Sequence, residues 1–134
     1  MHVAGVATDS LTHLAALFQR TSQMAMEEAR KRIAKAKAEE ATSLDLIGLE
    51  LVELPEDVWE LAPYLTELDC SSNQLTSLEG LDKLVSLTEL RCEENELTSL
   101  DGLDKLVNLT ELHCYENQLT SLEGLDKLVS LTEL

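Results

Sequence analysis

The stretch LTELDCSSNQLTSLEGLDKLVS, residues 65–86, decides the fold because it recurs twice more without a gap. The second copy, LTELRCEENELTSLDGLDKLVN, spans 87–108, and the third, LTELHCYENQLTSLEGLDKLVS, spans 109–130. A truncated unit, LTEL, follows at 131–134. A period in the twenties is typical of a solenoid, in which no unit buries its apolar residues alone and stacked units share one core.

Each unit combines two spacings of apolar residues. In LTELHC, Leu112 and Cys114 are two residues apart, so in a strand they face one side, while Glu111 and His113 face the other. Beyond Asn117 the leucines recur every third residue, which aligns their side chains in a 3₁₀ turn. These leucines are Leu119, Leu122, Leu125 and Leu128. Every unit therefore predicts one short strand followed by one tight return.

The pattern L-x-x-L-x-(L/C)-x-x-N-x-L resembles the leucine-rich repeat family, and the match covers roughly 41–134. Within that family it resembles the 22-residue units of internalins and SDS22-type proteins. The resemblance implies an α/β solenoid curved like a horseshoe, with a parallel β-sheet on its concave face and 3₁₀ or turn returns on its convex side. It also implies an interior ladder of asparagines that bond the backbone of neighbouring turns, formed by Asn73, Asn95 and Asn117.

The units are preceded by an irregular first unit, 41–64, in which Leu49 takes the asparagine place. Its sequence LPEDVWEL resembles the longer return of other bacterial repeat proteins. Residues 22–40 predict an N-terminal capping helix, because apolar residues are spaced for one helical stripe that could cover the first unit. Residues 1–21 form an uncertain lead segment, either disordered or an upstream extension of a protein that starts at Met24 or Met26.

The charge of the chain excludes one class of partner. A formal net charge of -16 and a pI near 4.3 argue against nucleic acid, which basic patches bind. No run of about 18 apolar residues predicts a transmembrane helix. The N-terminus lacks a basic leader and carries Asp9 in its apolar part, which fits a secretory signal poorly. We therefore expect a cytoplasmic protein that does not bind membranes.

The adjacent His113 and Cys114 are the strongest catalytic hint in the sequence, yet neighbours in a strand face opposite sides and cannot act together. Cys70, Cys92 and Cys114 take an inward leucine place, where cysteine behaves as a small buried hydrophobe. In-register cysteines on neighbouring strands have poor disulfide geometry, and the cytosol is reducing. One cysteine per unit also supplies too few metal ligands. We expect no catalytic residue, metal or cofactor.

A column of glutamates follows one outward strand position and includes Glu67, Glu89, Glu111 and Glu133. Stacked carboxylates could raise one another's pKa or hold Ca²⁺. Because Ca²⁺ prefers six to eight oxygens around a point, a flat column favours a solvated acidic face instead.

The first and third units differ at only three places, all predicted on or beside the outward strand face. Constant leucines with a variable face indicate a protein-binding module. The predicted partner-binding residues are Glu67, Asp69, Ser71, Glu89, Arg91, Glu93, Glu111, His113 and Tyr115. Tyr115 is the expected anchor, because an exposed aromatic ring offers much apolar area at small entropic cost.

Two further expectations concern what the chain contacts or belongs to. The partner is another protein, expected to have a basic surface, and the uncapped C-terminal edge could self-associate. The alternative hypothesis is a repeat fragment of a larger signalling enzyme or effector, similar to a Roco-type GTPase, whose catalytic domain lies outside this sequence. No P-loop motif occurs in these residues.

Overall fold

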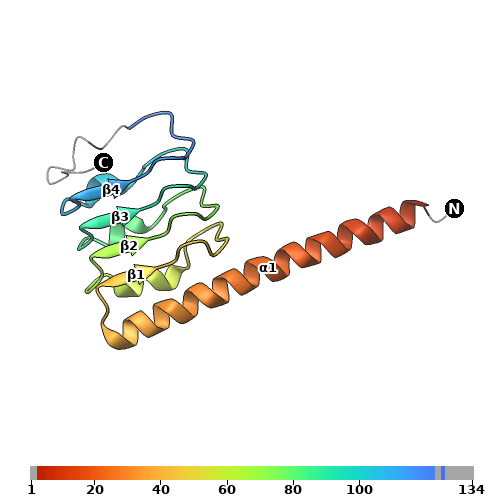
Figure 1. The fold of residues 1–134 in the computed structure, drawn as a ribbon, viewed down its shortest axis with the longest axis horizontal. Helices are drawn as coiled ribbons and strands as arrows, with labels where there is room; N and C mark the ends of the chain where they lie inside the picture. Colours follow the sequence, from red (N-terminus) through yellow and green to blue (C-terminus); the bar gives the residue numbers. More distant parts are fainter. Residues whose placement is uncertain (1–2, 123–124, 126–134) are drawn as a thin grey trace.

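The computed structural model describes residues 3–122 and residue 125, and the truncated unit at 131–134, with Glu133, lies outside them. A long helix precedes strands that alternate with 3₁₀ helices (Figure 1). The elements are α1 (Val3–Glu39), β1 (Ser43–Asp45), η1 (Glu56–Leu61), β2 (Glu67–Asp69), η2 (Leu81–Lys83), β3 (Glu89–Arg91), η3 (Leu103–Lys105) and β4 (Glu111–His113).

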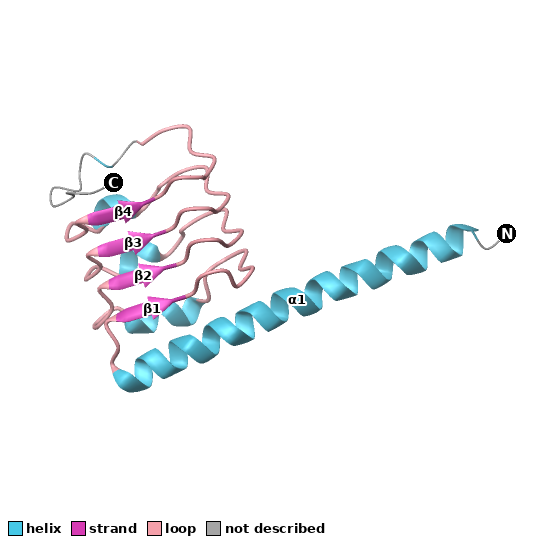
Figure 2. Cartoon of the chain, in the orientation of Figure 1, coloured by secondary structure: helices cyan, strands magenta, loops and turns pink. Residues whose placement is uncertain are grey.

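The four strands form one parallel sheet in the order β1-β2-β3-β4 (Figure 2). Leu68 pairs with Leu90, and Leu90 pairs with Leu112, so the register advances by one repeat between neighbouring strands. The threonine before each strand repeats its bonds as well. Thr88 donates from N and from Oγ1 to Thr66 O, at 2.7 and 3.2 Å, and Thr110 does the same to Thr88 O, at 2.8 and 3.0 Å. Identical sequence therefore produces identical contacts between units.

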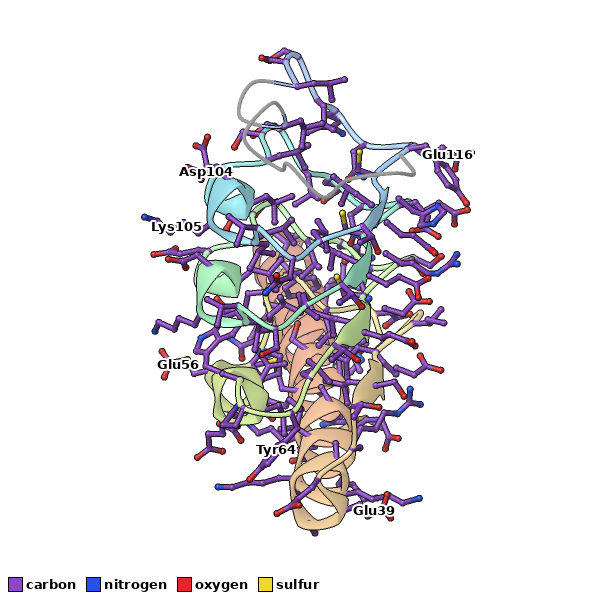
Figure 3. All side chains as sticks on the ribbon, turned by 90° about the vertical axis from the view of Figure 1, so that its left-hand side faces the viewer. Glu39, Glu56, Tyr64, Asp104, Lys105 and Glu116 are labelled. Atoms are coloured by element: carbon purple, nitrogen blue, oxygen red, sulfur yellow. The ribbon has the colours of Figure 1, made fainter. Side chains whose placement is uncertain are left out.

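The core lies between the sheet and the 3₁₀ returns. Figure 3 shows the strands along one side and the 3₁₀ helices along the other, with Glu116 on the strand side and Asp104 and Lys105 on the return side. Leu90 from a strand and Leu81 and Leu103 from the returns are almost completely buried. The 3₁₀ geometry is limited to three residues in η2 and η3, and turns form the rest of each return. The predicted α/β leucine-rich repeat solenoid is confirmed.

The asparagine side chains bind backbone groups of two successive units. Asn73 Oδ1 accepts hydrogen bonds from Leu49 N and Leu51 N, both at 3.0 Å. In the following units, Asn95 Oδ1 accepts a hydrogen bond from Leu75 N at 3.0 Å, and Asn117 Oδ1 accepts one from Leu97 N at 3.0 Å. These bonds satisfy amides that would otherwise be buried without a partner.

Helix α1 covers the first unit through small residues on one face. Ala25, Ala29 and Ala36 are buried with Ile33, and alanine lets the helix axis approach β1 and η1 closely. Ion pairs at the edges of this contact join Arg30 to Asp57 at 3.8 Å, Lys37 to Glu60 at 3.5 Å, and Arg32 to Asp45 at 3.8 Å. The expected N-terminal helical cap is therefore present.

The helix is much longer than the capping helix predicted for 22–40. It begins at Val3 and continues without a break through the segment expected to be an uncertain lead. Figure 1 shows it running far beyond the edge of the repeats. Side chains from 10 to 20 are exposed, among them Leu11, Leu14 and Phe18 at 67%, 61% and 64%. Of the α1 side chains that the structure describes, from residue 10 onward, those that pack on the solenoid lie in the C-terminal half of the helix.

Candidate functional site

The outward strand positions form a grid of charged side chains on the concave sheet. Glu67 pairs with Glu89 and Glu89 with Glu111, while Asp69 pairs with Arg91 and Arg91 with His113. In-register parallel strands lie about 4.8 Å apart, so each side chain has its counterpart from the next unit as a neighbour. The predicted glutamate column and the variable column beside it thus come together on one face.

Two short-range interactions organise this grid. Arg91 Nε donates to Glu89 Oε1 at 2.9 Å, and this hydrogen bond raises the pKa of the Arg91 guanidinium. His113 Nε2 lies 3.8 Å from Glu111 Oε2, which is too long for a hydrogen bond. Glu111 is more exposed than His113, with 38% of its side-chain surface accessible against 17%. The glutamates are therefore partnered by the variable residue two places along the strand in these two units.

Two residues that lie just beyond β2 and β3 are less exposed than the sequence predicts. Ser71 and Glu93 are buried, at 6% and 7% exposure. Ser71 turns back to donate from N and Oγ to Asp69 Oδ1, at 3.0 and 2.6 Å. Glu93 Oε2 is buried without a hydrogen-bond partner in the described part of the chain. Ser71 and Glu93 are therefore covered by their neighbours, and neither side chain projects from the face.

Tyr115 occupies the same repeat position as Ser71 and Glu93 but is exposed, at 56%. The negative charge of Glu93 raises the pKa of the Tyr115 hydroxyl. Of the three residues at this position, the tyrosine alone presents apolar area to solvent.

The concave face also includes residues that the sequence argument missed. A shallow hollow over the first three strands is lined by Asp45 and Ile47 together with the expected Glu67, Asp69 and Arg91. Asp45 pairs in register with Asp69, because LDL in the irregular unit occupies the place of LDC. The match between LDL and LDC could have identified Asp45 from the sequence. The irregular first unit is 24 residues long instead of 22, which makes that match hard to recognise.

The cysteines lie on the inner side of the sheet and are free thiols. Cys70 and Cys92 are fully buried, and Cys114 is half-buried at the edge of the core. Burial raises the pKa of Cys70 to about 12 and raises that of Cys92 as well. Because the thiolate is the nucleophile and the metal ligand, these two thiols are poorly suited to either role.

Two glutamates and a histidine lie close together on β3 and β4. Ligand atoms of Glu89, Glu111 and His113 all lie within 4.8 Å of one another. Neither the inward cysteines nor the flat glutamate column predicts this set, because it combines two members of the column with the variable residue of β4. The signal was the spacing in ELH, which places Glu111 and His113 on the same side of β4.

Comparisons with known proteins agree with this architecture. Residues 65–105 match a family model described as leucine-rich repeats in two copies. Internalin C2 from Listeria monocytogenes superposes with a TM-score of 0.67 at 25% identity, covering 74% of this chain and 43% of that one. The functional domain of InlJ from the same organism, which includes a cysteine ladder, gives 0.61 at 37% identity, covering 70% and 20%.

A leucine-rich repeat protein from Leptospira interrogans gives a TM-score of 0.61 at 28% identity, covering 75% of this chain and 33% of that one. This chain thus spans less than half the length of each of these structures. No curated protein matches its sequence. Among the described residues, no helix combines the length and the apolar character needed to cross a membrane.

Proposed function

We propose that this chain, a leucine-rich repeat protein with internalin-like repeats, binds another protein through the concave face of its solenoid. Leucine-rich repeat domains of this kind are typically interaction modules rather than enzymes. The proposal extends that general property to one surface of this chain. The contacts are the outward residues of β2 to β4 and Tyr115.

The observation that carries the proposal is where the units differ. The first and third units are identical except at three places, which are occupied by Asp69, Ser71 and Ser72 in one and by His113, Tyr115 and Glu116 in the other. On the convex side, the LDKLV segment is identical in the three 22-residue units. A scaffold that needed only to fold has no reason to vary along one face, whereas a binding surface does.

The electrostatics of the face indicate the kind of partner. The glutamate column, Asp45 and Asp69 surround one arginine, so the strand surface is predominantly negative. A partner with a basic surface around an apolar pocket for Tyr115 would complement it, since charge complementarity steers association. Burial of the exposed ring would then supply much of the affinity. This arrangement supports a basic protein rather than an acidic one.

The test is affinity capture from a lysate of the source organism with matched variants. Glu67→Lys and Tyr115→Ala alter the concave face, the first by reversing one charge of the glutamate column. Lys83→Glu and Val107→Ala make the same kinds of change at exposed convex positions, where Val107 is 49% accessible. All four should keep the fold, because surface changes usually cost within about 0.5 kcal/mol.

We expect a captured protein to be lost with the two concave variants and retained with the two convex variants. Capture of that protein should also weaken as salt concentration rises, because screening reduces the attraction between exposed charges. Retention by the concave variants together with loss by Lys83→Glu would move the binding surface to the convex side and refute the proposal.

A further inference from the structure

The side chain of His113 on the concave face has one ring nitrogen that is buried and unpartnered. His113 Nε2 is buried from solvent and makes no hydrogen bond within the described residues. Polar atoms in such positions are normally satisfied by protein or water. Its neighbours are carboxylate oxygens of Glu111, from the same strand, and Glu89, from the next. The nitrogen therefore belongs to a set of three groups that are all typical metal ligands.

The separation of these groups suits a shared ion better than a hydrogen bond. His113 Nε2 and Glu111 Oε2 are 3.8 Å apart. Two ligands at tetrahedral angles around Zn²⁺, each about 2.1 Å from the metal, lie about 3.4 Å apart. Because the widest separation in the set is within 4.8 Å, rotation of the long glutamate side chains suffices to close the site.

We propose that Glu89, Glu111 and His113 form a binding site for one divalent transition-metal ion of the Zn²⁺ class. An imidazole with two carboxylates suits zinc and its neighbours in the first transition row, whereas Mg²⁺ and Ca²⁺ prefer oxygen ligands alone. Three protein ligands leave at least one coordination position open toward the concave groove. The three ligands are also among the contacts proposed above for a protein partner, but the inference of a metal ion does not rest on that proposal.

The surroundings of the three ligands are consistent with a bound cation. Glu89 is oriented by its hydrogen bond from Arg91, which uses Oε1 and leaves Oε2 to bind the ion. Ligating carboxylates in proteins are commonly held by such outer partners. The positive charge of Arg91 opposes a cation, but Glu67 and Asp69 on β2, with the buried Glu93, leave the local balance negative.

Among the three full units, the third carries a histidine at the variable outward strand position. The position of His113 is held by Asp69 in the first unit and by Arg91 in the second. An aspartate lacks the nitrogen ligand, and an arginine repels the ion. The described repeats thus contain one Glu-Glu-His set, and we expect one ion per chain.

The test is titration of the full chain with Zn²⁺ by isothermal calorimetry, in a non-chelating buffer with a phosphine reductant. His113→Gln and Glu111→Gln should each weaken binding at least about tenfold, since even loss of an outer partner of a metal ligand costs that much. Glu67→Gln is the matched control, because it removes the same charge from the same column without removing a ligand. Circular dichroism verifies that each variant retains the fold.

A cobalt substitution identifies the atoms that bind. Co²⁺ should give visible absorption typical of nitrogen and oxygen ligands, and the band should disappear with His113→Gln. A sulfur-to-cobalt charge-transfer band would instead assign the ion to the cysteines and overturn the proposal. So would equal Zn²⁺ affinity in wild type and His113→Gln, which would indicate diffuse attraction to the acidic face. If Glu67→Gln weakens binding as much as Glu111→Gln, the assigned ligand set is wrong.

Discussion

Replacement of Asn95 by alanine tests how the asparagine ladder stabilises the solenoid. Asn95 Oδ1 accepts from Leu75 N, while Nδ2 donates to the carbonyls of Cys70, Cys92 and Glu93. Those carbonyls each have a second donor. Cys70 O also accepts from the side chain of Asn73, Cys92 O from that of Asn117, and Glu93 O from the amide of Ser72.

Asn95→Ala therefore leaves one buried group without its partner, the Leu75 amide. An unsatisfied buried donor costs about 1 to 3 kcal/mol, so the free energy of unfolding should fall by that amount. Asn73→Ala removes the partner of Leu49 N and of Leu51 N, and also the donor to Leu46 O. With three groups affected instead of one, its cost should be roughly two to three times greater.

Urea unfolding followed by circular dichroism measures both effects, and Glu96→Ala, an exposed neighbour of Asn95, is the control. The control should change the free energy of unfolding by less than about 0.5 kcal/mol. If Asn95→Ala and Asn73→Ala lower the free energy of unfolding equally, the argument is refuted. The stability would then not depend on the number of backbone groups that lose their partner.

Three further outcomes are expected. Gly80→Ala should destabilise more than Gly102→Ala in thermal unfolding: both glycines have φ near +90°, which costs alanine about 1 to 2 kcal/mol, but only at Gly80 would the new Cβ lie 2.5 Å from the Trp59 ring. The pKa of Cys70 is raised from 9.0 to about 12 on folding, so its stabilising contribution should be present below pH 9 and lost toward pH 12, by up to about 1.4 kcal/mol per pH unit. Urea unfolding across this range should show a shallower decline for Cys70→Ala, and an equal slope would contradict the shift. A thiol reagent should label half-buried Cys114 in the native protein while Cys70 stays unreactive until unfolding, and mass spectrometry distinguishes the two.

The repeat could be predicted from the sequence because each unit carries the full set of contacts that it makes. Leucine spacing alone predicts the strand face, and the 22-residue period predicts the register that pairs Leu68 with Leu90 and Leu112. Neither depends on residues far from the unit. The length of α1 could not be predicted in this way, because its side chains from 10 to 20 are exposed and so leave no packing pattern in the sequence.

The fine structure of the face was also beyond the sequence pattern. Ser71, Glu93 and Tyr115 share a repeat position, yet the first two are buried and the third is exposed. Ser72, Glu94 and Glu116, which follow them, adopt φ between 53° and 56° without being glycines. That left-handed turn redirects the chain after each strand, and strand alternation does not anticipate it.

The matching bonds from Thr110 to Thr88 and from Thr88 to Thr66 have a consequence for evolution. When every junction in a stack is the same, an in-frame duplication of one unit adds a layer whose two junctions already exist elsewhere in the protein. The added layer therefore packs without any new core contacts. The sheet grows in steps of about 4.8 Å, and each added layer contributes positions that are open to mutation while the leucines beneath them stay constant. The length of the outward strand face is thus set by the number of repeats that the gene encodes.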